Sequence, residues 1–282
     1  MGNHISGANI NQNLRTFNLL DTIMTALNPT SNDVFFYPFL ESNGDRVQAY
    51  GQAEDEELDV TFNGTTGGLD AVATSLAPFQ HLGGVHSYGF VGEDSPALVG
   101  ADVAALSFNG TSDVAFSVGC MFFVAPGNTG TLIAKYDVAG SAEEWRLHIL
   151  SGPDLALELF ETVIDDSETA QTTTALNDGQ WYSGIVTYGG AGGDGAGGQT
   201  ANADMIIYID GVSVTRSNSE VGGTYNDMVG GAAPLMIGAT DDKAAPANEF
   251  TGRIALPFVM SSALSSANAA IVSAAGRTLL GL

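Results

Sequence analysis

Phe116-Ser-Val-Gly-Cys-Met-Phe-Phe-Val124 is a short stretch rich in aromatic and β-branched residues, and such composition predicts a buried strand. Comparable stretches recur from Asp33 onward and are separated by Gly, Asn, Asp and Pro. They are Val34–Tyr37, Gly130–Lys135, Trp145–Ile149, Leu155–Glu161, Tyr182–Tyr188, Met205–Ile209 and Leu235–Ile237. The intervals carry turn dipeptides such as Asn63-Gly64, Asn109-Gly110 and Asp210-Gly211. This pattern predicts an all-β, two-sheet antiparallel jelly-roll sandwich and argues against a doubly wound α/β fold.

The chain is strongly acidic, and this limits its partners. It has 282 residues, 32 acidic and 8 basic side chains, and a formal net charge of −24. The only lysines are Lys135 and Lys243, and the arginines are scattered singly, so binding to nucleic acid is not expected. No run approaches the ~20 apolar residues of a membrane span, and the start lacks a secretory signal. We therefore expect neither a nucleic-acid nor a membrane partner.

Residues 11–28 follow a different pattern and predict an amphipathic helix. Leu14, Phe17, Leu20, Met24 and Leu27 recur at steps of three or four, with Asn28-Pro29 as the stop. One helix alone cannot bury this apolar stripe. It must dock on the following domain, on another copy of itself, or on a larger assembly. We expect the five residues to form a partner-binding surface for attachment or oligomerisation.

The chain divides into an N-terminal arm, residues 1–32, and a sandwich domain, residues 33–282. Residues 63–104 show little periodicity and read as a long insertion in that domain. Gly189–Gly198 is predicted to be a flexible tip between two strands. The Ala-rich segment Ser265–Ala275 predicts a short C-terminal helix that closes the domain.

The order of these segments resembles the laminin-G-like, concanavalin-A-like jelly-roll family, in particular its bacterial and phage-borne branch. The motifs that carry the resemblance span about residues 34–282. They include Phe36-Tyr-Pro-Phe-Leu-Glu41, Ala105-Leu-Ser-Phe-Asn-Gly-Thr-Ser-Asp113, Trp145-Arg-Leu-His148, Trp181-Tyr-Ser-Gly-Ile-Val-Thr-Tyr-Gly189, Ile206-Ile-Tyr-Ile-Asp-Gly-Val212 and Phe250-Thr-Gly-Arg-Ile254. The resemblance implies two packed antiparallel sheets, with ligands at loops along one rim or on the concave face. It also implies glycan binding, adhesion or structural attachment as the usual roles. Several roles stay open because fold alone does not fix an activity.

Catalysis is not expected, although the family includes β-glucanases. Their Glu-x-Asp-x-x-Glu motif has its nearest match at Glu57-Leu-Asp-Val-Thr-Phe62, where Phe62 replaces the second Glu. Glu158 and Glu161 have odd spacing, so on a strand their side chains point to opposite faces. A retaining glycosidase needs two carboxylates about 5 Å apart, and neither set supplies them.

No metal site is certain from the sequence. His81 and His86 lie in a Gly-rich loop and lack the convergent partners that zinc needs. Calcium is possible at Asp241-Asp242, because carboxylates and backbone carbonyls could converge there, but a solvated acidic turn is the simpler interpretation. Trp145 and Trp181 could stack on sugars, yet their flanks favour packing in the core. Cys120 is expected to be a small buried hydrophobe.

These observations combine into one hypothesis. The resembled family acts outside cells, but the start of the sequence shows no export signal. A virus particle is released by lysis without secretion, so we expect a non-enzymatic phage virion protein that decorates a capsid or tail. Its expected partners are a capsid or tail protein, further copies of itself and glycans. An exported carbohydrate-binding adhesin, located outside the cell, is the first alternative. A polysaccharide-cleaving enzyme is the second.

Overall fold

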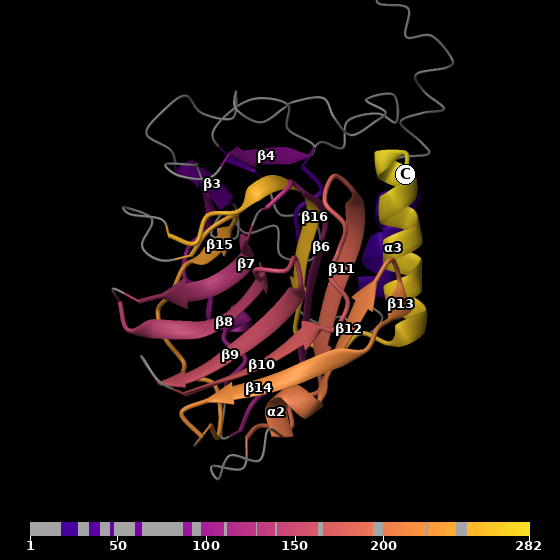
Figure 1. The fold of residues 1–282 in the computed structure, drawn as a ribbon. Helices are drawn as coiled ribbons and strands as arrows, with labels where there is room; N and C mark the ends of the chain where they lie inside the picture. Colours follow the sequence, from indigo (N-terminus) through magenta and orange to yellow (C-terminus); the bar gives the residue numbers. More distant parts are fainter. Residues whose placement is uncertain are drawn as a thin grey trace, which may run out of the picture.

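A computed structural model describes thirteen segments of the chain. They are residues 18–27, 34–39, 46–47, 60–63, 87–91, 97–109, 112–127, 129–138, 140–162, 166–193, 200–223, 225–240 and 247–282. Within these segments two antiparallel sheets face each other, and helix α3 (Ser266–Leu280) lies beside one of them (Figure 1). The predicted two-sheet antiparallel sandwich with an N-terminal and a C-terminal helix is confirmed.

The described part of the first sheet has seven strands in the order β1-β16-β6-β11-β12-β13, and β4 pairs with β16. Its strands are β1 (Val34–Phe36), β4 (Tyr88–Val91), β6 (Phe116–Val124), β11 (Trp181–Tyr188), β12 (Met205–Ile209), β13 (Val212–Ser213) and β16 (Thr251–Met260). In the described segments the second sheet has nine strands, in the order β14-β10-β9-β8-β7-β15-β5-β3-β2. They are β2 (Arg46–Val47), β3 (Val60–Asn63), β5 (Ala97–Val99), β7 (Gly130–Asp137), β8 (Ala142–Ile149), β9 (Leu155–Thr162), β10 (Asp166–Thr172), β14 (Arg216–Val221) and β15 (Leu235–Ile237).

Strand β6 explains why its sequence is apolar almost throughout. Cys120 and Phe122 belong to the core between the sheets, whereas Met121 belongs to a second core between the seven-stranded sheet and the helices. Both faces of β6 are therefore buried, and a strand buried on both faces loses the apolar–polar alternation. Cys120 is 2% exposed, so the prediction of a small buried hydrophobe is confirmed.

Helix 18–27 packs on the outer side of the seven-stranded sheet, beside α3. Leu20 and Leu27 are fully buried, and Met24 packs partly buried against the same cluster. The Asn268 side chain of α3 donates a hydrogen bond to the Ala26 carbonyl at 2.9 Å. The described helical residues 18–27 lie within the predicted helix, whereas residues 11–17 and the predicted stop at Asn28-Pro29 lie outside the described residues.

The partner-binding role expected for this helix needs correction at two positions. Leu20 and Leu27 contact their own sandwich, because the sheet and α3 offer an apolar surface that covers the stripe. A partner cannot reach either side chain in this arrangement. Leu14 and Phe17 lie outside the described residues, so their expected role stays a prediction.

Other predicted elements can be compared with the structure in turn. The Asp210-Gly211 turn joins β12 to β13, with positive φ values of 51° and 80° that fit a type I′ hairpin. Helix α3 begins where predicted, with Ser265 as its N-cap, and extends to Leu280 rather than ending at Ala275. The described parts of residues 63–104 include β4, β5 and the short 3-10 helix η4 (Ala104–Leu106), so this stretch contributes strands to both sheets.

Candidate functional site

The sandwich has an edge where β14 ends one sheet and β12–β13 ends the other (Figure 1). A pocket of about 380 Å³ lies there, which we name the rim pocket. Its polar lining residues are Thr172, Thr174, Asn177, Tyr182 and Thr215. Its apolar lining residues are Ala175, Leu176, Ile209 and Val214. The volume lies within the range of small-molecule sites, which is about 300–1,000 Å³.

Hydrogen bonds hold the loop between β10 and β11 in place around this pocket. The Thr173 amide donates to the Thr215 carbonyl at 3.2 Å, and the two threonine hydroxyls lie 2.7 Å apart. The Leu176 amide donates to the Pro153 carbonyl at 3.0 Å. The Asn177 amide donates to the Tyr182 hydroxyl at 2.8 Å. These bonds tie the loop to its surroundings at several points, so the pocket walls are formed in the folded chain.

The lining of the rim pocket carries no charged side chain. Hydroxyl groups and one amide can both donate and accept hydrogen bonds, whereas Leu176, Ile209 and Val214 supply apolar surface. Such a mixture suits a ligand that has many hydroxyl groups and an apolar face. The rim pocket could therefore hold an uncharged sugar unit.

A second candidate lies on the outward face of β7, β8 and β9. The Arg146 guanidinium carbon is 5.1 Å from the Tyr136 ring centroid and 5.4 Å from that of Phe160. Arg146 Nη2 also lies 2.7 Å from Glu158 Oε2, and Glu158 Oε1 accepts from the Ser167 hydroxyl at 3.0 Å. Each charged group in this cluster already has a partner within the chain, so the cluster offers less to a ligand than the rim pocket does.

His148 lies beside this cluster, with its Nε2 3.7 Å from Glu158 Oε2. Burial, with a smaller contribution from the charge of Arg146, lowers the pKa of His148 to about 3. The imidazole is consequently neutral at pH 7. A neutral, buried histidine with so low a pKa is a poor general acid or base near neutral pH.

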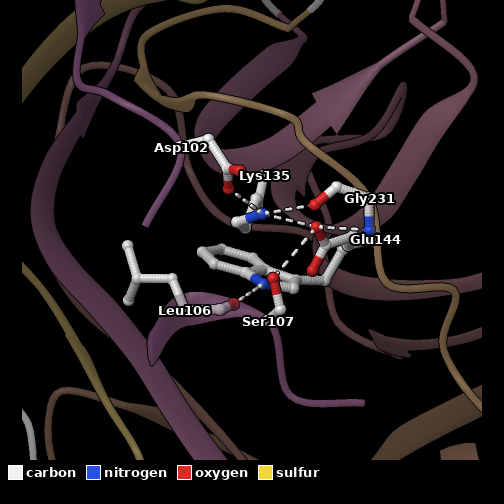
Figure 2. Close-up of polar contacts among 7 residues, drawn as sticks. Asp102, Leu106, Ser107, Lys135, Glu144 and Gly231 are labelled. Atoms are coloured by element: carbon white, nitrogen blue, oxygen red, sulfur yellow. Dashed lines mark hydrogen bonds and ion pairs between the residues drawn. The ribbon is translucent and has the colours of Figure 1, made fainter. Parts of the chain in front are cut away.

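A third candidate is the buried ion pair between Lys135 on β7 and Glu144 on β8 (Figure 2). The Lys135 ammonium also contacts Asp102 Oδ1 at 2.9 Å and the Gly231 carbonyl at 3.4 Å. Glu144 Oε1 accepts from the Ser107 hydroxyl and the Gly231 amide as well (Figure 2). Burial raises the pKa of Glu144, and the charge of Lys135 opposes that rise.

This pair holds two connecting segments against the nine-stranded sheet. All three ammonium hydrogens of Lys135 have an acceptor, and its side chain is fully buried. Lys135 is thus a crosslink rather than a nucleophile. The neighbouring Trp145 donates its indole N–H to the Leu106 carbonyl at 3.0 Å, which fixes η4 at the same place.

Asp113 makes a similar crosslink at another position. Its Oδ2 accepts from the hydroxyls of Tyr188 at 2.6 Å and Tyr225 at 2.8 Å, and its Oδ1 accepts from the Met228 amide. Burial raises the pKa of Asp113, and these hydrogen bonds oppose that rise. The carboxylate anchors the segment after β14 to the body of the sandwich.

The carboxylates considered for glycosidase chemistry do not form a pair in the described residues. Glu158 is bound to Arg146, whereas Glu161 accepts from the Asn226 amide at 2.7 Å. The predicted opposite orientation of Glu158 and Glu161 fits these separate partners. Glu57 and Asp59 lie outside the described residues.

Among the described residues, no group of three or more His, Cys, Asp or Glu side chains converges as a metal site requires. The sequence candidates Asp241, Asp242, His81 and His86 lie outside the described residues. No helix among the described segments is both long and apolar enough to cross a membrane.

The two tryptophans occupy packing positions, as predicted. Trp145 is fully buried in the core between the sheets. Trp181 is partly buried and packs against the core beneath the helices. Neither ring lines the rim pocket, where the aromatic group is Tyr182.

Comparison with known families identifies the class of this protein. Residues 99–270 match the model of the concanavalin A-like lectin/glucanases superfamily. The match covers more than half of the chain, so the chain belongs to this superfamily. A comparison with curated proteins found no match.

Solved structures similar to this chain include receptor-binding domains of botulinum neurotoxins. One comes from a study of how neurotoxin type C enters cells by interaction with two ganglioside molecules, with TM-score 0.55, 14% identity and coverage of 91% of this chain and 53% of that one. The serotype C1 binding domain has TM-score 0.54 and 15% identity, and the match covers 88% of this chain and 52% of that one. The binding domain of neurotoxin DC in complex with SialylT has TM-score 0.50 and 12% identity, and the match covers 86% and 52%. This chain spans about half the length of these domains, and at such identities the similarity shows the fold.

The rim pocket was not predicted from the sequence. Its wall contains the run Thr172-Thr-Thr-Ala-Leu-Asn177, which reads locally as an ordinary polar connection between strands. The partners of this loop, Val214 and Thr215, are about 40 positions further along the chain. Only the pairing of β10 with β14 brings the two segments together.

Proposed function

We propose that this chain is a non-catalytic carbohydrate-binding domain that holds an uncharged glycan unit in the rim pocket. The observation that carries the proposal is the lining of that pocket, which combines hydroxyl and amide groups with apolar surface and has no charged side chain. Its volume of about 380 Å³ accommodates a small saccharide. Membership of a superfamily that includes lectins supports the same conclusion.

The negative charge of the chain favours neutral over anionic glycans as ligands. A formal net charge of −24 produces a negative potential around the molecule, which disfavours approach of anionic sugars. Structural neighbours were solved with SialylT or studied for ganglioside interaction, and those ligands belong to the neurotoxins. For this chain we propose a neutral oligosaccharide instead.

The absence of catalysis is part of the proposal. Glu158 is held by Arg146 and Ser167, whereas Glu161 is bound to Asn226. The rim pocket has no carboxylate among its lining residues. We infer that the chain binds a glycan without cleaving it, and that glucan polymers incubated with it release no reducing ends.

Binding to a panel of neutral and anionic oligosaccharides, followed by calorimetric titration of the best ligand, tests the proposed site. Thr174→Trp places a large ring in the rim pocket from an exposed position, and we expect it to weaken binding at least tenfold. Ser217→Trp makes an equally large change at an exposed position of β14 outside the pocket, and it should leave affinity unchanged. Failure of every neutral glycan to bind, or equal binding by Thr174→Trp and the wild type, would contradict the proposal.

The biological setting proposed from the sequence is the surface of a phage virion, with an exported adhesin as the alternative. The acidic exterior supports either setting, because like charge keeps crowded copies apart. The buried positions of Leu20 and Leu27 remove them as a tether, so attachment would need other residues. Mass spectrometry of purified particles tests the virion setting by the presence and stoichiometry of this polypeptide.

A further inference from the structure

Strand β14 is the last strand of the nine-stranded sheet, so one of its two edges has no neighbouring strand among the described residues (Figure 1). The Thr173 amide donates to the Thr215 carbonyl, which makes these two residues a hydrogen-bonded pair at the start of the β10–β14 ladder. Hydrogen-bonded pairs alternate with non-hydrogen-bonded pairs along an antiparallel ladder. Every second residue of β14 therefore has its backbone N–H and C=O at the free edge. These edge residues are Arg216, Asn218 and Glu220.

The short helix α2 (Thr200–Ala203) contacts β14 without using these backbone groups. The Asn202 side chain donates from Nδ2 to the Ser219 carbonyl at 3.0 Å, and Ser219 belongs to the residues whose backbone groups point to β10. Arg216 Nη2 donates to the Ala203 carbonyl. Asn202 is fully buried, so α2 holds β14 from inside the sandwich. The outer backbone groups of the edge residues take no part in these contacts.

The side chains of the edge residues lie on the inward face of β14, since Asn218 is opposite the core residue Ala170. Within the described residues each has a buried polar atom without a hydrogen-bond partner, namely Arg216 Nε, Asn218 Oδ1 and Glu220 Oε1. The residue opposite Glu220 in β10 is another carboxylate, Glu168. Arg216 is four residues away from Glu220, which is about 13 Å along a strand at ~3.3 Å per residue. The cation and the anion of this edge are therefore too far apart to pair within one strand.

A second β14 strand is complementary to this edge. When two copies pair antiparallel about a twofold axis at Asn218, Arg216 of each copy lies opposite Glu220 of the other. The edge residues then form hydrogen-bonded pairs, and each such pair exchanges two backbone hydrogen bonds. Opposite residues have Cβ atoms about 4.5–5.5 Å apart, and opposite charges so placed stabilise a sheet. A register shifted by two residues would place Arg216 opposite Asn218 and would lose one or both charge pairs.

We propose that the free edge of β14 is a dimerisation surface, at which two copies of this chain join their nine-stranded sheets. The twofold arrangement makes the same surface complementary to itself, as an isologous interface requires. The charge pattern identifies a second copy as the occupant, because Arg216 and Glu220 each find the opposite charge there. Val221, which is 58% exposed, would lie opposite Thr215 of the second copy and become partly covered.

The proposed dimer is weak. One strand per copy gives a small contact, and interfaces below about 1,200 Å² belong to weak or transient complexes. Two chains with a net charge of −24 also repel each other, although salt at about 0.15 M screens that repulsion beyond roughly 8 Å. We therefore expect a dissociation constant on the order of 100 μM at this ionic strength.

Sedimentation equilibrium of the full chain up to about 500 μM tests for the dimer, because half or more of the chain would then be paired. Asn218→Pro should keep the mass of one chain throughout, since it removes an N–H at the free edge, where proline is tolerated. Asn218→Thr keeps that N–H and should dimerise as the wild type does. Melting followed by circular dichroism shows that each variant is folded. A wild-type chain that stays monomeric over this range overturns the proposal.

Exchange of charge tests the register. Arg216→Glu and Glu220→Arg each place like charges opposite each other, so each variant alone should dimerise at least tenfold more weakly. An equimolar mixture of the two variants restores opposite charges at both positions and should form mixed dimers. The mixture also controls for the loss of the bond between Arg216 and the Ala203 carbonyl, which a purely structural effect of Arg216→Glu would involve. A mixture that stays as monomeric as its components contradicts the register.

Disulfide trapping gives an independent readout of the same register. The two copies of residue 218 would be opposite each other, about 5.5 Å apart between Cα atoms, which is within the range of a disulfide. The two copies of residue 219 would be diagonal, about 7–8 Å apart. Mild oxidation should therefore link Asn218→Cys into dimers faster than Ser219→Cys, although Ser219 is the more exposed position. Native Cys120 is buried and does not compete.

Equal or faster crosslinking of Ser219→Cys would indicate random collision and overturn the proposal. All these outcomes concern the mass of the protein and its crosslinks. They are independent of whether a glycan binds at the rim pocket.

Discussion

Replacement of Lys135 by Met gives a quantitative test of the crosslink in Figure 2. Methionine has a similar length but no charge, so Glu144 would lose its buried counter-ion. Removal of one partner of a buried pair costs about 3–5 kcal/mol, since the remaining charge is uncompensated. Glu144 keeps donors from Ser107 and Gly231, which favours the lower end of that range. We therefore expect Lys135→Met to lower the free energy of unfolding by about 3 kcal/mol at pH 7.5.

The double variant Lys135→Met/Glu144→Gln separates charge from packing. Glutamine keeps an oxygen that can accept from Ser107 and the Gly231 amide, but it carries no charge. The double variant should regain most of the stability that the single variant loses. Urea unfolding followed by tryptophan fluorescence measures both values, and Trp145 in the same cluster is a suitable probe.

The direction in which the stability of Lys135→Met changes with pH tests whether the buried charge of Glu144 causes the loss. Burial already raises the pKa of Glu144, and loss of Lys135 removes the charge that opposes this rise. The folded single variant would then bind a proton that the unfolded chain has released, so its stability should increase as the pH falls toward 5.5. The free energy of unfolding of the variant should change by up to about 1.4 kcal/mol per pH unit, the value for uptake of one proton. A loss that is equal at pH 5.5 and 7.5, or a double variant no more stable than the single one, would refute this account.

Two other predictions concern the outward cluster and the N-terminal helix. His148 has a folded-state pKa of about 3 against an unfolded value of ~6.5, so the unfolded chain gains a proton first as the pH falls. His148→Gln should abolish a stability loss of about 1.4 kcal/mol between pH 7.5 and 5.5, and an unchanged pH profile would disprove the assignment. Leu27→Ala should lower the free energy of unfolding by about 2–5 kcal/mol, because a fully buried leucine leaves a cavity. A stable Leu27→Ala variant with an altered oligomeric mass would instead restore the helix as a partner-binding element.

The strands that could be predicted from the sequence are those whose residues pack in the core. Phe116–Val124, Met205–Ile209 and Leu235–Ile237 are observed with the predicted bounds. Burial of side chains selects apolar residues at these positions, so composition alone reveals them. The order of these strands also carried the resemblance to the superfamily, which the family comparison confirms.

The strands that could not be predicted are polar. β10 reads Asp-Ser-Glu-Thr-Ala-Gln-Thr from Asp166, and β14 reads Arg-Ser-Asn-Ser-Glu-Val from Arg216. Their residues gain stability from the ladder between the two strands and from partners far along the chain, such as Asn202. Local propensity does not report such long-range pairing.

The position of the N-terminal helix illustrates a different limit. Its apolar stripe predicted the helix correctly and showed that something must cover it, but several surfaces could satisfy that requirement. The cover comes from the seven-stranded sheet and from α3, whose residues begin more than 200 positions later. A pattern within one segment defines what must be buried, whereas the complementary surface is defined only by the assembled fold.

At the edge formed by β14, inward-facing positions of the sandwich carry polar side chains where the rest of the core is apolar. A free sheet edge needs protection from pairing with other chains, and α2 supplies part of it through the Asn202–Ser219 bond. An apolar interior would have served that purpose without cost, yet the inward faces there carry two carboxylates and two partnerless amide oxygens. Buried polar groups of this kind destabilise the folded chain unless a ligand compensates them. The same edge holds the rim pocket, so partnerless buried polar atoms and a pocket of about 380 Å³ lie along one edge of the sandwich, as expected where stability is given up for binding.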